Sequence, residues 1–258
     1  MKAMILAAGL GTRLRPLTDD RPKALVEVAG HTLLELTLLR LRSFGVHEVI
    51  INTHHFADQV AEFLRARGSF GMRIEISREE ELLDTGGGLK KAATFFLHSA
   101  DPDEPFLVHN VDVLSSVDLA SMLHFHREHS ALATLAVQDR STSRYLLFDS
   151  SGLLCGRRAG LEGQPEWARP ARDAQARAFC GIHVLSPRIF SLMQEDGAFS
   201  IIPVYLRLAA LGERILAFPA EDAYWRDLGR PESIKLATRE FENGLDLQCD
   251  ARAPRPAH

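Results

Sequence analysis

The chain has 258 residues, with a hydrophobic fraction of 46%, a charged fraction of 25% and a formal net charge of −4. This length and composition are typical of a globular protein with one large domain, or with one domain and an appended lobe. The negative net charge argues against a nucleic-acid binder that relies on bulk positive charge.

The cysteines and the apolar segments indicate the cellular compartment that is expected for the protein. Cys155, Cys180 and Cys249 are widely spaced and odd in number, so neither a disulfide framework nor a zinc cluster is expected. A reducing, cytoplasmic location follows as the simplest prediction. The N-terminus begins at once with a strand pattern, and no segment has the apolar length of a membrane span, so no membrane partner is expected.

Short apolar strands alternate with amphipathic helices through the first half of the chain. Strands are predicted at 2–8, 48–52, 72–77 and 105–109, and helices at 32–43, 56–67 and 88–97. This alternation predicts an α/β protein with a Rossmann-like, mainly parallel sheet and helices on both faces. Ligands of such sheets bind beyond the carboxyl ends of the strands, so we expect Gly9, Asn52, Ser77 and Asp112 to gather at one edge.

The pattern changes after Asp118, where the predicted strands become shorter. Helices are predicted at 118–129, 187–193, 201–211 and 231–243, and strands at 132–137, 145–149, 153–157, 178–185 and 215–219. Residues 156–177 are rich in Gly, Pro and Arg without a clear period, which predicts a mobile loop.

A glycine loop follows the first strand and carries two fixed cations. Gly9 and Gly11 allow a sharp turn and a close approach of backbone N–H groups to an anion. Arg13 offers a planar fork of donors to phosphate, and Lys23 is a point charge restrained by Pro22. The segment lacks the Gly-Lys-Ser/Thr of a P-loop and the third glycine or alanine of a dinucleotide loop. It therefore predicts a different triphosphate cradle, suited to nucleotidyl transfer.

The residues from Gly9 to Thr18, followed by Pro-Lys-Ala-Leu at 22–25, resemble the sugar nucleotidyltransferases. The resemblance continues through 27–30, 84–88, Asp112, 179–182 and 225–229, and so covers nearly all of the chain up to about Phe241. In that family, a sugar 1-phosphate attacks the α-phosphorus of a metal-bound nucleoside triphosphate, giving a nucleotide sugar and pyrophosphate.

The resemblance implies the nucleotide-diphospho-sugar transferase fold as a single domain at 1–243. Its nucleotide-binding half would span about 1–115 and its sugar-binding half 116–243, followed by a disordered tail at 244–258. The expected partners are a nucleoside triphosphate and a sugar 1-phosphate, with Mg²⁺ as cofactor and no nucleic acid. A monomer or small homo-oligomer is expected.

The resemblance also implies the residues of the site. Arg13 and Lys23 would be catalytic, and Asp112 and Asp227 would hold Mg²⁺, which favours one or two carboxylates. The nucleotide-binding positions would be Ala8, Gly9, Gly11, Thr12, Arg13, Asn52, Glu80, Gly86 and Gly87. Glu79 is the alternative to Glu80, because the alignment is uncertain by one residue. The N–H groups of 86–88, expected just before a helix, would face the nucleotide or the sugar.

The sugar-binding positions implied by the resemblance are Asn110, Arg158 and Gly181. Many relatives carry a Glu-Lys-Pro motif whose lysine grips the sugar phosphate, whereas this chain has Cys-Gly-Arg-Arg-Ala at 155–159. Arg157 or Arg158 would replace that lysine, with surface solvation as the alternative for either. Val111 and Arg230 also depart from the family pattern, where many relatives have Gly and Thr.

The short chain and the Leu-Leu-Asp-Thr-Gly-Gly sequence at 82–87 are most similar to the N-acetylmuramate 1-phosphate uridylyltransferases, which implies UTP as the nucleotide. A GTP-dependent mannose 1-phosphate guanylyltransferase is the alternative within the family. A nucleotide-sugar sensor without turnover is the alternative from another class.

Overall fold

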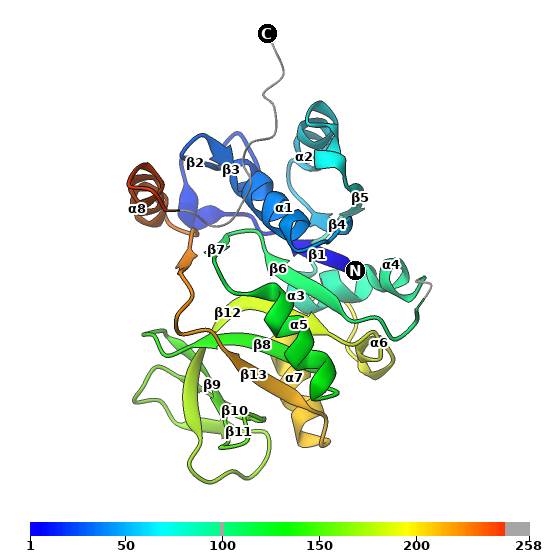
Figure 1. Cartoon of the computed structure of the whole chain (residues 1–258), viewed down its shortest axis with the longest axis vertical. Helices are drawn as coiled ribbons and strands as arrows, with labels where there is room; N and C mark the ends of the chain where they lie inside the picture. The colour runs from blue at the N-terminus through cyan, green and yellow to red at the C-terminus, as the bar shows by residue number, and fades with distance from the viewer. Residues whose placement is uncertain (99–100, 246–258) are drawn as a thin grey trace.

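A ten-stranded mixed sheet forms the centre of the computed structural model, which describes residues 1–98 and 101–245 (Figure 1). The first half of the chain contributes β1 (Lys2–Leu6), β4 (Glu48–Thr53), β5 (Arg73–Arg78) and β6 (Phe106–Asn110). The second half contributes β8 (Ala133–Gln138), β9 (Arg144–Phe148), β10 (Leu154–Ala159), β11 (Pro165–Trp167), β12 (Gln175–Leu185) and β13 (Ile215–Pro219). The strand order is β11-β10-β9-β12-β6-β1-β4-β5, with β8 paired to β12 and β13 paired to β8.

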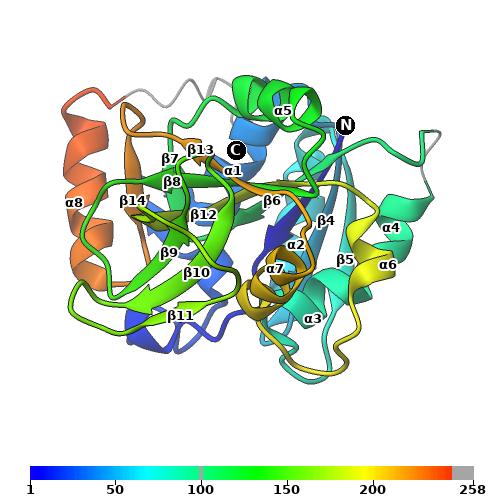
Figure 2. The same ribbon diagram turned by 90° about the horizontal axis from the view of Figure 1, so that it is seen from below.

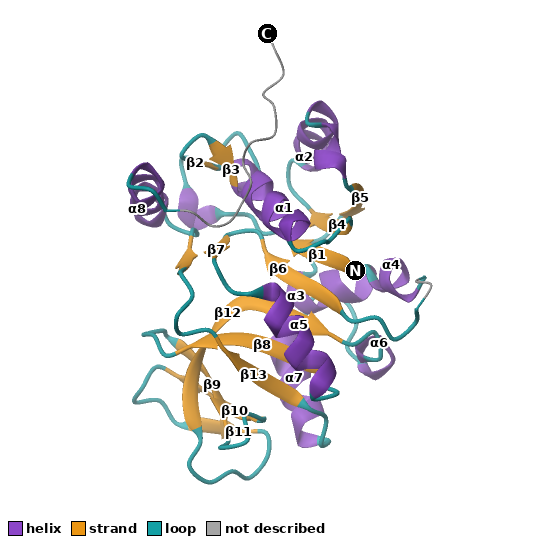
Figure 3. Ribbon diagram, in the orientation of Figure 1, coloured by secondary structure: helices purple, strands orange, loops and turns teal. Residues whose placement is uncertain are grey.

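Helices pack on both faces of this sheet (Figure 3). The α-helices are α1 (Leu33–Ser43), α2 (Ala57–Ala66), α3 (Asp84–Lys91), α4 (Ala93–Leu97), α5 (Leu119–Glu128), α6 (Ile189–Leu192), α7 (Ile201–Ala210) and α8 (Pro231–Glu242). The 3₁₀ turns are η1 (Thr12–Leu14), η2 (Lys23–Leu25) and η3 (Gly68–Gly71). Side chains of α1, α2, α5 and α8 form one core cluster, and those of α3, α4, α6 and α7 form another.

Alternation along β1 separates the two cores, because successive side chains of a strand point to opposite faces. Ala3 and Ile5 belong to the first cluster, and Met4 belongs to the second. Helix α1 covers the first face with its leucines, and the Thr32 side chain caps it by accepting from the N–H of Glu35 at 3.1 Å. The predicted helix at 32–43 is therefore confirmed, and its leucines lie in the core.

The parallel strands β6, β1, β4 and β5 place their carboxyl ends at one edge of the sheet. Residues 6, 52 and 110 pair across neighbouring strands, so the loops that follow them begin side by side. The predicted α/β class is confirmed by this arrangement and by the known structures described below. Beyond β6, strand β12 runs antiparallel and begins an antiparallel extension formed by β8 to β12.

Two small sheets flank the large one. In the first, β7 (Val113–Ser115) pairs antiparallel with β14 (Trp225–Asp227), and in the second β2 (Glu27–Val28) pairs with β3 (His31–Thr32). Figure 2 shows β14 beside helix α8, and α8 also contacts β2. Helix α8 is thereby brought back against the N-terminal part of the chain.

Two expectations about local structure are wrong, and a third is described only in part. The predicted mobile loop at 156–177 is mainly a hairpin of β10 and β11 leading into β12, and its edge strand tolerates Pro165. Gly86, Gly87 and Gly88 lie inside α3 rather than before a helix. Of the predicted tail, the structure describes only Gly244 and Leu245, and the Leu245 N–H donates to Glu240 O of α8 at 2.9 Å. The rest of the predicted tail, 246–258, lies outside the described residues.

Candidate active site

The glycine loop after β1 is shaped by one obligatory glycine. Gly11 has φ +63°, and a Cβ there would lie 3.0 Å from Thr18 Cγ2 and 3.1 Å from Lys23 Cβ. The Thr18 hydroxyl donates to Gly11 O at 2.9 Å, which closes the loop. Pro22, at φ −67°, precedes η2 and positions Lys23 at its start. The loop thus packs directly against Lys23.

Lys23 contacts the carboxylate of Asp112. The side chains of Lys23 and Asp112 are only 12% and 15% exposed, so solvent screens this pair less than a surface pair. Asp112 follows β6, and the preceding residue, Val111, donates its N–H to Leu6 O at 3.1 Å. The first loop and the end of β6 therefore meet through opposite charges.

Arg13 and Asp227 meet at a second glycine, Gly229. A Cβ at Gly229 would lie 2.6 Å from Arg13 Nη2 and 2.8 Å from Asp227 Oδ1. The Gly229 N–H donates to Asp227 Oδ1 at 2.8 Å, and the Leu228 N–H donates to Asp112 O at 2.8 Å. The four charged residues singled out from the sequence, Arg13, Lys23, Asp112 and Asp227, thus form one cluster.

Asn52 links three segments at the same edge of the sheet. Its Oδ1 accepts from the Ala7 N–H at 2.7 Å, and its Nδ2 donates to Glu79 Oε1 at 2.8 Å. Glu79 Oε2 accepts from the Leu83 N–H at 3.0 Å. Asn52 and Glu79 are 3% and 4% exposed, whereas Glu80 is exposed at the surface. The structure therefore gives the neighbouring glutamates different positions: Glu79 supports the loop, and Glu80 is accessible to a ligand.

The glycines of α3 pack against the segment before α7. The N–H groups of Gly86 and Gly87 donate to Phe199 O at 2.8 and 3.2 Å. A Cβ at Gly88 would lie 2.7 Å from both Asn52 Nδ2 and Glu79 Oε1. The expectation that the N–H groups of Gly86 and Gly87 face the nucleotide is therefore wrong in this structure, since another backbone carbonyl accepts them.

Gly181 and Asn110 adjoin each other on the expected sugar side. Gly181 has φ +74°, and a Cβ there would lie 2.7 Å from Asn110 Nδ2. The pairing of β12 with β8 shifts register between Phe179 and His183, which places Gly181 in a β-bulge. The bulge brings the backbone of β12 against the residue that lies two positions before Asp112.

The two candidate arginines of β10 differ in their contacts. Arg157 is paired with Glu166, with Nε and Oε2 2.7 Å apart. Arg158 Nε is buried without a hydrogen-bond partner, and its guanidinium carbon lies 6.0 Å from the centre of the Tyr145 ring. Arg157 is thus paired with a carboxylate of the protein, whereas Arg158 forms no ion pair with any residue that the structure describes.

Arg140 lies beside the site but was not predicted from the sequence. Its guanidinium lies 3.5 Å from the centre of the Trp225 ring, and its Nη2 donates to Phe179 O at 2.8 Å. Trp225 belongs to the same β14 strand as Asp227, and its Nε1 donates to Cys180 O at 2.8 Å. The one local signal for Arg140 is its place just after the carboxyl end of β8, where ligand-binding residues of α/β sheets gather.

Neither described cysteine has the environment of a nucleophile. Burial raises the pKa of Cys155 to about 11 and that of Cys180 to about 12, which favours the neutral thiol. Within residues 1–98 and 101–245, no three His, Cys, Asp or Glu side chains are grouped so as to hold a metal ion. In the same part of the chain, no helix is both long and apolar enough to cross a membrane.

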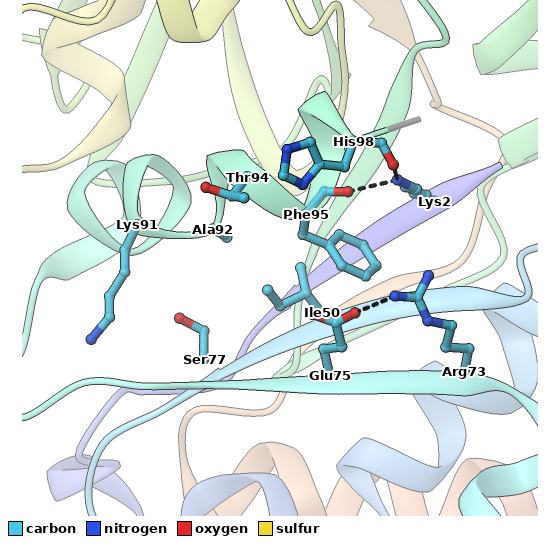
Figure 4. Close-up of a pocket in the computed structure, with 10 residues that line it drawn as sticks. All are labelled: Lys2, Ile50, Arg73, Glu75, Ser77, Lys91, Ala92, Thr94, Phe95 and His98. Carbon is cyan, nitrogen blue, oxygen red and sulfur yellow. Dashed lines mark hydrogen bonds and ion pairs between the residues drawn. The ribbon is translucent and has the colours of Figure 1, made fainter. Parts of the chain in front are cut away.

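A separate cavity of about 300 Å³ lies between β4, β5 and α4, lined by residues that include Lys2, Arg73, Lys91 and His98 (Figure 4). Its cations are bonded within the protein. Lys2 Nζ donates to Phe95 O at 2.6 Å, Arg73 pairs with Glu48 and Glu75, and Lys91 donates to Arg78 O. The charged cluster at the carboxyl ends of the strands, rather than this cavity, is the candidate active site.

Comparison with known proteins gives one consistent family. The family model described as nucleotidyl transferase matches residues 2–244. An N-acetylmuramate alpha-1-phosphate uridylyltransferase of Caulobacter vibrioides is 37% identical over 91% of this chain and 94% of its own. A mannose-1-phosphate guanyltransferase of Yarrowia lipolytica is 29% identical over 95% of this chain and 65% of its own. The solved structure of a putative glucose-1-phosphate thymidylyltransferase from Bacillus anthracis covers 95% of this chain at 18% identity, with a TM-score of 0.76.

Proposed function

Because the chain belongs to the nucleotidyl transferase family and is a sugar-1-phosphate nucleotidyltransferase, we propose that it transfers a uridylyl group from UTP to N-acetylmuramate 1-phosphate. The products are the nucleotide sugar and pyrophosphate. The similarity to the Caulobacter vibrioides uridylyltransferase supports this choice, since it extends over nearly the whole of both chains at 37% identity.

The convergence of Arg13, Lys23, Asp112 and Asp227 is the observation that carries the proposal. In the reaction, a phosphate oxygen of the sugar 1-phosphate forms a bond to the α-phosphorus while the bond to the β-phosphate oxygen breaks. Charge develops on the equatorial and leaving oxygens, so the protein mainly positions the reactants and supplies positive charge. An arginine and a lysine held at one loop meet that requirement.

Each cation has a separate task in this scheme. Arg13 binds the β- and γ-phosphates, which leave as pyrophosphate, through its fork of donors. Lys23 meets the α-phosphate and the incoming sugar phosphate, and its contact with Asp112 fixes its position before substrate arrives. Gly229 leaves room for Arg13 beside Asp227, because any larger residue would overlap the guanidinium.

Asp112 and Asp227 fit a magnesium ion that is bound together with the nucleotide. Among the described residues, Asp112 Oδ1 and Asp227 Oδ2 have no hydrogen-bond partner, so each carboxylate keeps an oxygen for a cation. Two carboxylates with water and phosphate oxygens are a donor set that suits Mg²⁺. When bound, the ion would neutralise phosphate charge that Arg13 and Lys23 do not reach.

The Asn52 and Glu79 pair supports the nucleotide side. Because Ala7, Asn52, Glu79 and Leu83 are joined through buried or partly buried hydrogen bonds, the loops after β1, β4 and β5 are tied together at one edge. Glu80, exposed beside this edge, is available to read the base, and Ala8, Gly9 and Thr12 continue the same edge toward the phosphates.

GTP with mannose 1-phosphate is the second candidate pair, favoured by the similarity to mannose-1-phosphate guanylyltransferases. The chain spans 65% of the length of the Yarrowia lipolytica protein, which makes this pair the weaker candidate. The cytoplasmic location, the monomer or small homo-oligomer and the disordered tail stay predictions.

A screen of four nucleoside triphosphates against a panel of sugar 1-phosphates tests the proposal. Release of pyrophosphate with UTP and N-acetylmuramate 1-phosphate, at a kcat/KM above that of the other pairs, is the expected result. Turnover that strongly prefers GTP and mannose 1-phosphate would establish the alternative. Binding of nucleotide sugar without pyrophosphate release from any pair would instead indicate a sensor.

A further inference from the structure

Arg140 and Arg158 are two partly buried cations without an acidic partner. In residues 1–98 and 101–245, no carboxylate lies within ion-pair distance of either guanidinium. Nearby arginines differ, because Arg157 pairs with Glu166, Arg169 with Asp149, and Arg177 with Asp139 and Glu221. A cation taken out of water without an opposite charge is destabilising, so two such groups that both adjoin Tyr145 indicate a missing anion.

Strand pairing places Arg158 on the face of the sheet that bears Tyr145. Arg158 is directly opposite Tyr145 on β9, Tyr145 is opposite Ala178 on β12, and Ala178 is opposite Gln138 on β8. Residues directly opposite each other share a face of the sheet. Arg157, one residue earlier, points to the other face because successive side chains alternate.

Arg140 approaches the same region from the end of β8. It lies two residues beyond Gln138 and stacks on Trp225. Burial lowers the pKa of Arg140, while the nearby Cys180, Asp227 and Tyr145 act to raise it. Tyr145, the neighbour of Arg158, and Asp227 of the charged cluster are thus both near enough to act on the charge of Arg140.

This region adjoins the expected sugar site. Cys180 O, which accepts from Trp225 Nε1, belongs to the residue before Gly181, and Gly181 packs against Asn110. A sugar seated over Gly181, with its phosphate at Lys23, would lie near Arg140, which donates to the O of Phe179, two residues before Gly181. The phosphates already have Arg13 and Lys23, so a further pair of cations calls for a further negative group.

We propose that Arg140 and Arg158 bind a carboxylate carried by the sugar of the sugar 1-phosphate, and so select carboxylated sugars over neutral ones. This inference rests on the proposed function, because it assumes a sugar 1-phosphate in the site. A guanidinium presents paired donors that match the two oxygens of a carboxylate. N-acetylmuramate carries such a group on its lactyl ether, whereas mannose does not.

Two substrates that differ only in the lactyl ether that carries this carboxylate provide the test. N-acetylmuramate 1-phosphate has the lactyl group, and N-acetylglucosamine 1-phosphate is the same sugar with a free hydroxyl in its place. The variants are Arg140→Gln, Arg158→Gln and the double substitution, with Arg157→Gln as the matched control because that arginine is paired with Glu166 on the opposite face. For each variant, kcat and KM are measured with UTP and both sugars.

In the Arg140 and Arg158 variants, the ratio of kcat/KM for the carboxylated sugar over the other sugar is expected to fall about tenfold or more. The change lies mainly in the KM for the sugar, and the KM for UTP changes little. Arg140→Lys restores part of the ratio, because it keeps the charge. Arg157→Gln keeps the wild-type ratio.

Equal losses of kcat/KM with the two sugars would overturn the inference, because they would show that Arg140 only ties its loop to Trp225. Wild-type kcat/KM values with both sugars would overturn it too. Calorimetric titration of the two sugar phosphates without nucleotide decides the question separately from turnover. Tighter binding of the carboxylated sugar by wild type, lost in Arg140→Gln, supports the inference even if another nucleotide proves to be the substrate. Equal binding of both sugars by wild type contradicts it.

Discussion

Lys23 and Asp112 are in direct contact although 89 residues separate them in the chain. The contact joins the loop after β1 to the end of β6, two strands that are hydrogen-bonded neighbours in the sheet. A charge held in this way needs little reorganisation when the phosphates react, which is the condition under which electrostatic catalysis is most effective.

Replacing this lysine tests its role in the transition state. Lys23→Met is expected to lower kcat by roughly a hundredfold or more, the scale seen when one preorganised charge is removed. Steady-state kinetics at saturating substrates measure the effect. Lys235→Met is the matched control, because Lys235 is exposed on α8. A folded Lys23→Met enzyme with near-normal kcat would remove Lys23 from the mechanism.

The two aspartates are predicted to act together with magnesium. Asp112→Asn and Asp227→Asn should each raise the magnesium concentration needed for half-maximal rate and lower the maximal rate, because an amide binds a hard cation poorly. Magnesium titrations of the rate check this, with Asp222→Asn, an exposed position just before β14, as control. Retention of the wild-type midpoint and rate would assign the substituted aspartate a structural role only.

The neighbouring glutamates 79 and 80 should separate into a structural and a binding position. Glu79→Ala leaves the Asn52 amide and the Leu83 N–H without their acceptor and should lower the free energy of unfolding by about 1–3 kcal/mol. Glu80→Ala, at an exposed position, should leave stability unchanged and raise the KM for UTP. Chemical denaturation and kinetics on both variants distinguish them. Equal stability losses would contradict this assignment.

Much of this site follows from the sequence because its residues lie in short, local patterns. Arg13 and Lys23 belong to one loop, and Asp112 follows a predicted strand, so the alternation of strands and helices brings these three residues to one edge. Asp227 came only from the family resemblance, because its strand, β14, was not predicted. The separation of Glu79 from Glu80 could not be predicted, because it depends on which carboxylate reaches Asn52 across the sheet.

Other features depend on pairing between distant segments. Arg140 is held at the site by its contacts with Trp225 and Phe179. Both residues lie far from it in the sequence, so no pattern near residue 140 predicts these contacts. The hairpin of β10 and β11 was not predicted, because its Gly, Pro and Arg residues are typical of a loop. An edge strand can contain such residues, since it needs neither a strong apolar alternation nor every backbone donor.

Buried histidines should make the fold sensitive to acid. Burial lowers the pKa of His126 from 6.5 to about 4, with a smaller contribution from Arg127. Between pH 6.5 and 4, His126 binds a proton in the unfolded chain but not in the folded chain. As the pH is lowered through this range, the free energy of unfolding therefore decreases by about 1.4 kcal/mol per pH unit because of this group. Burial acts in the same direction on His109 and His183, whose pKa values fall to about 4 and about 3.

The contribution of His126 can be isolated by substitution. Between pH 7 and pH 5, His126→Asn should lose about 2 kcal/mol less stability than the wild type. Urea denaturation at the two pH values gives this difference. His124→Asn, at an exposed position on the same helix, should lose as much as the wild type. An unchanged pH dependence for His126→Asn would show that folding does not lower the pKa of this histidine.

The fate of isotopic oxygen tests the proposed reaction most directly. The substrate is N-acetylmuramate 1-phosphate that carries ¹⁸O at the phosphate oxygens not bonded to the sugar. It is incubated with UTP and magnesium, and the masses of the products are measured by mass spectrometry. Attack on the α-phosphorus predicts that the nucleotide sugar retains every labelled oxygen and that the pyrophosphate carries none. Labelled pyrophosphate, or the absence of a nucleotide sugar, would contradict uridylyl transfer by this protein.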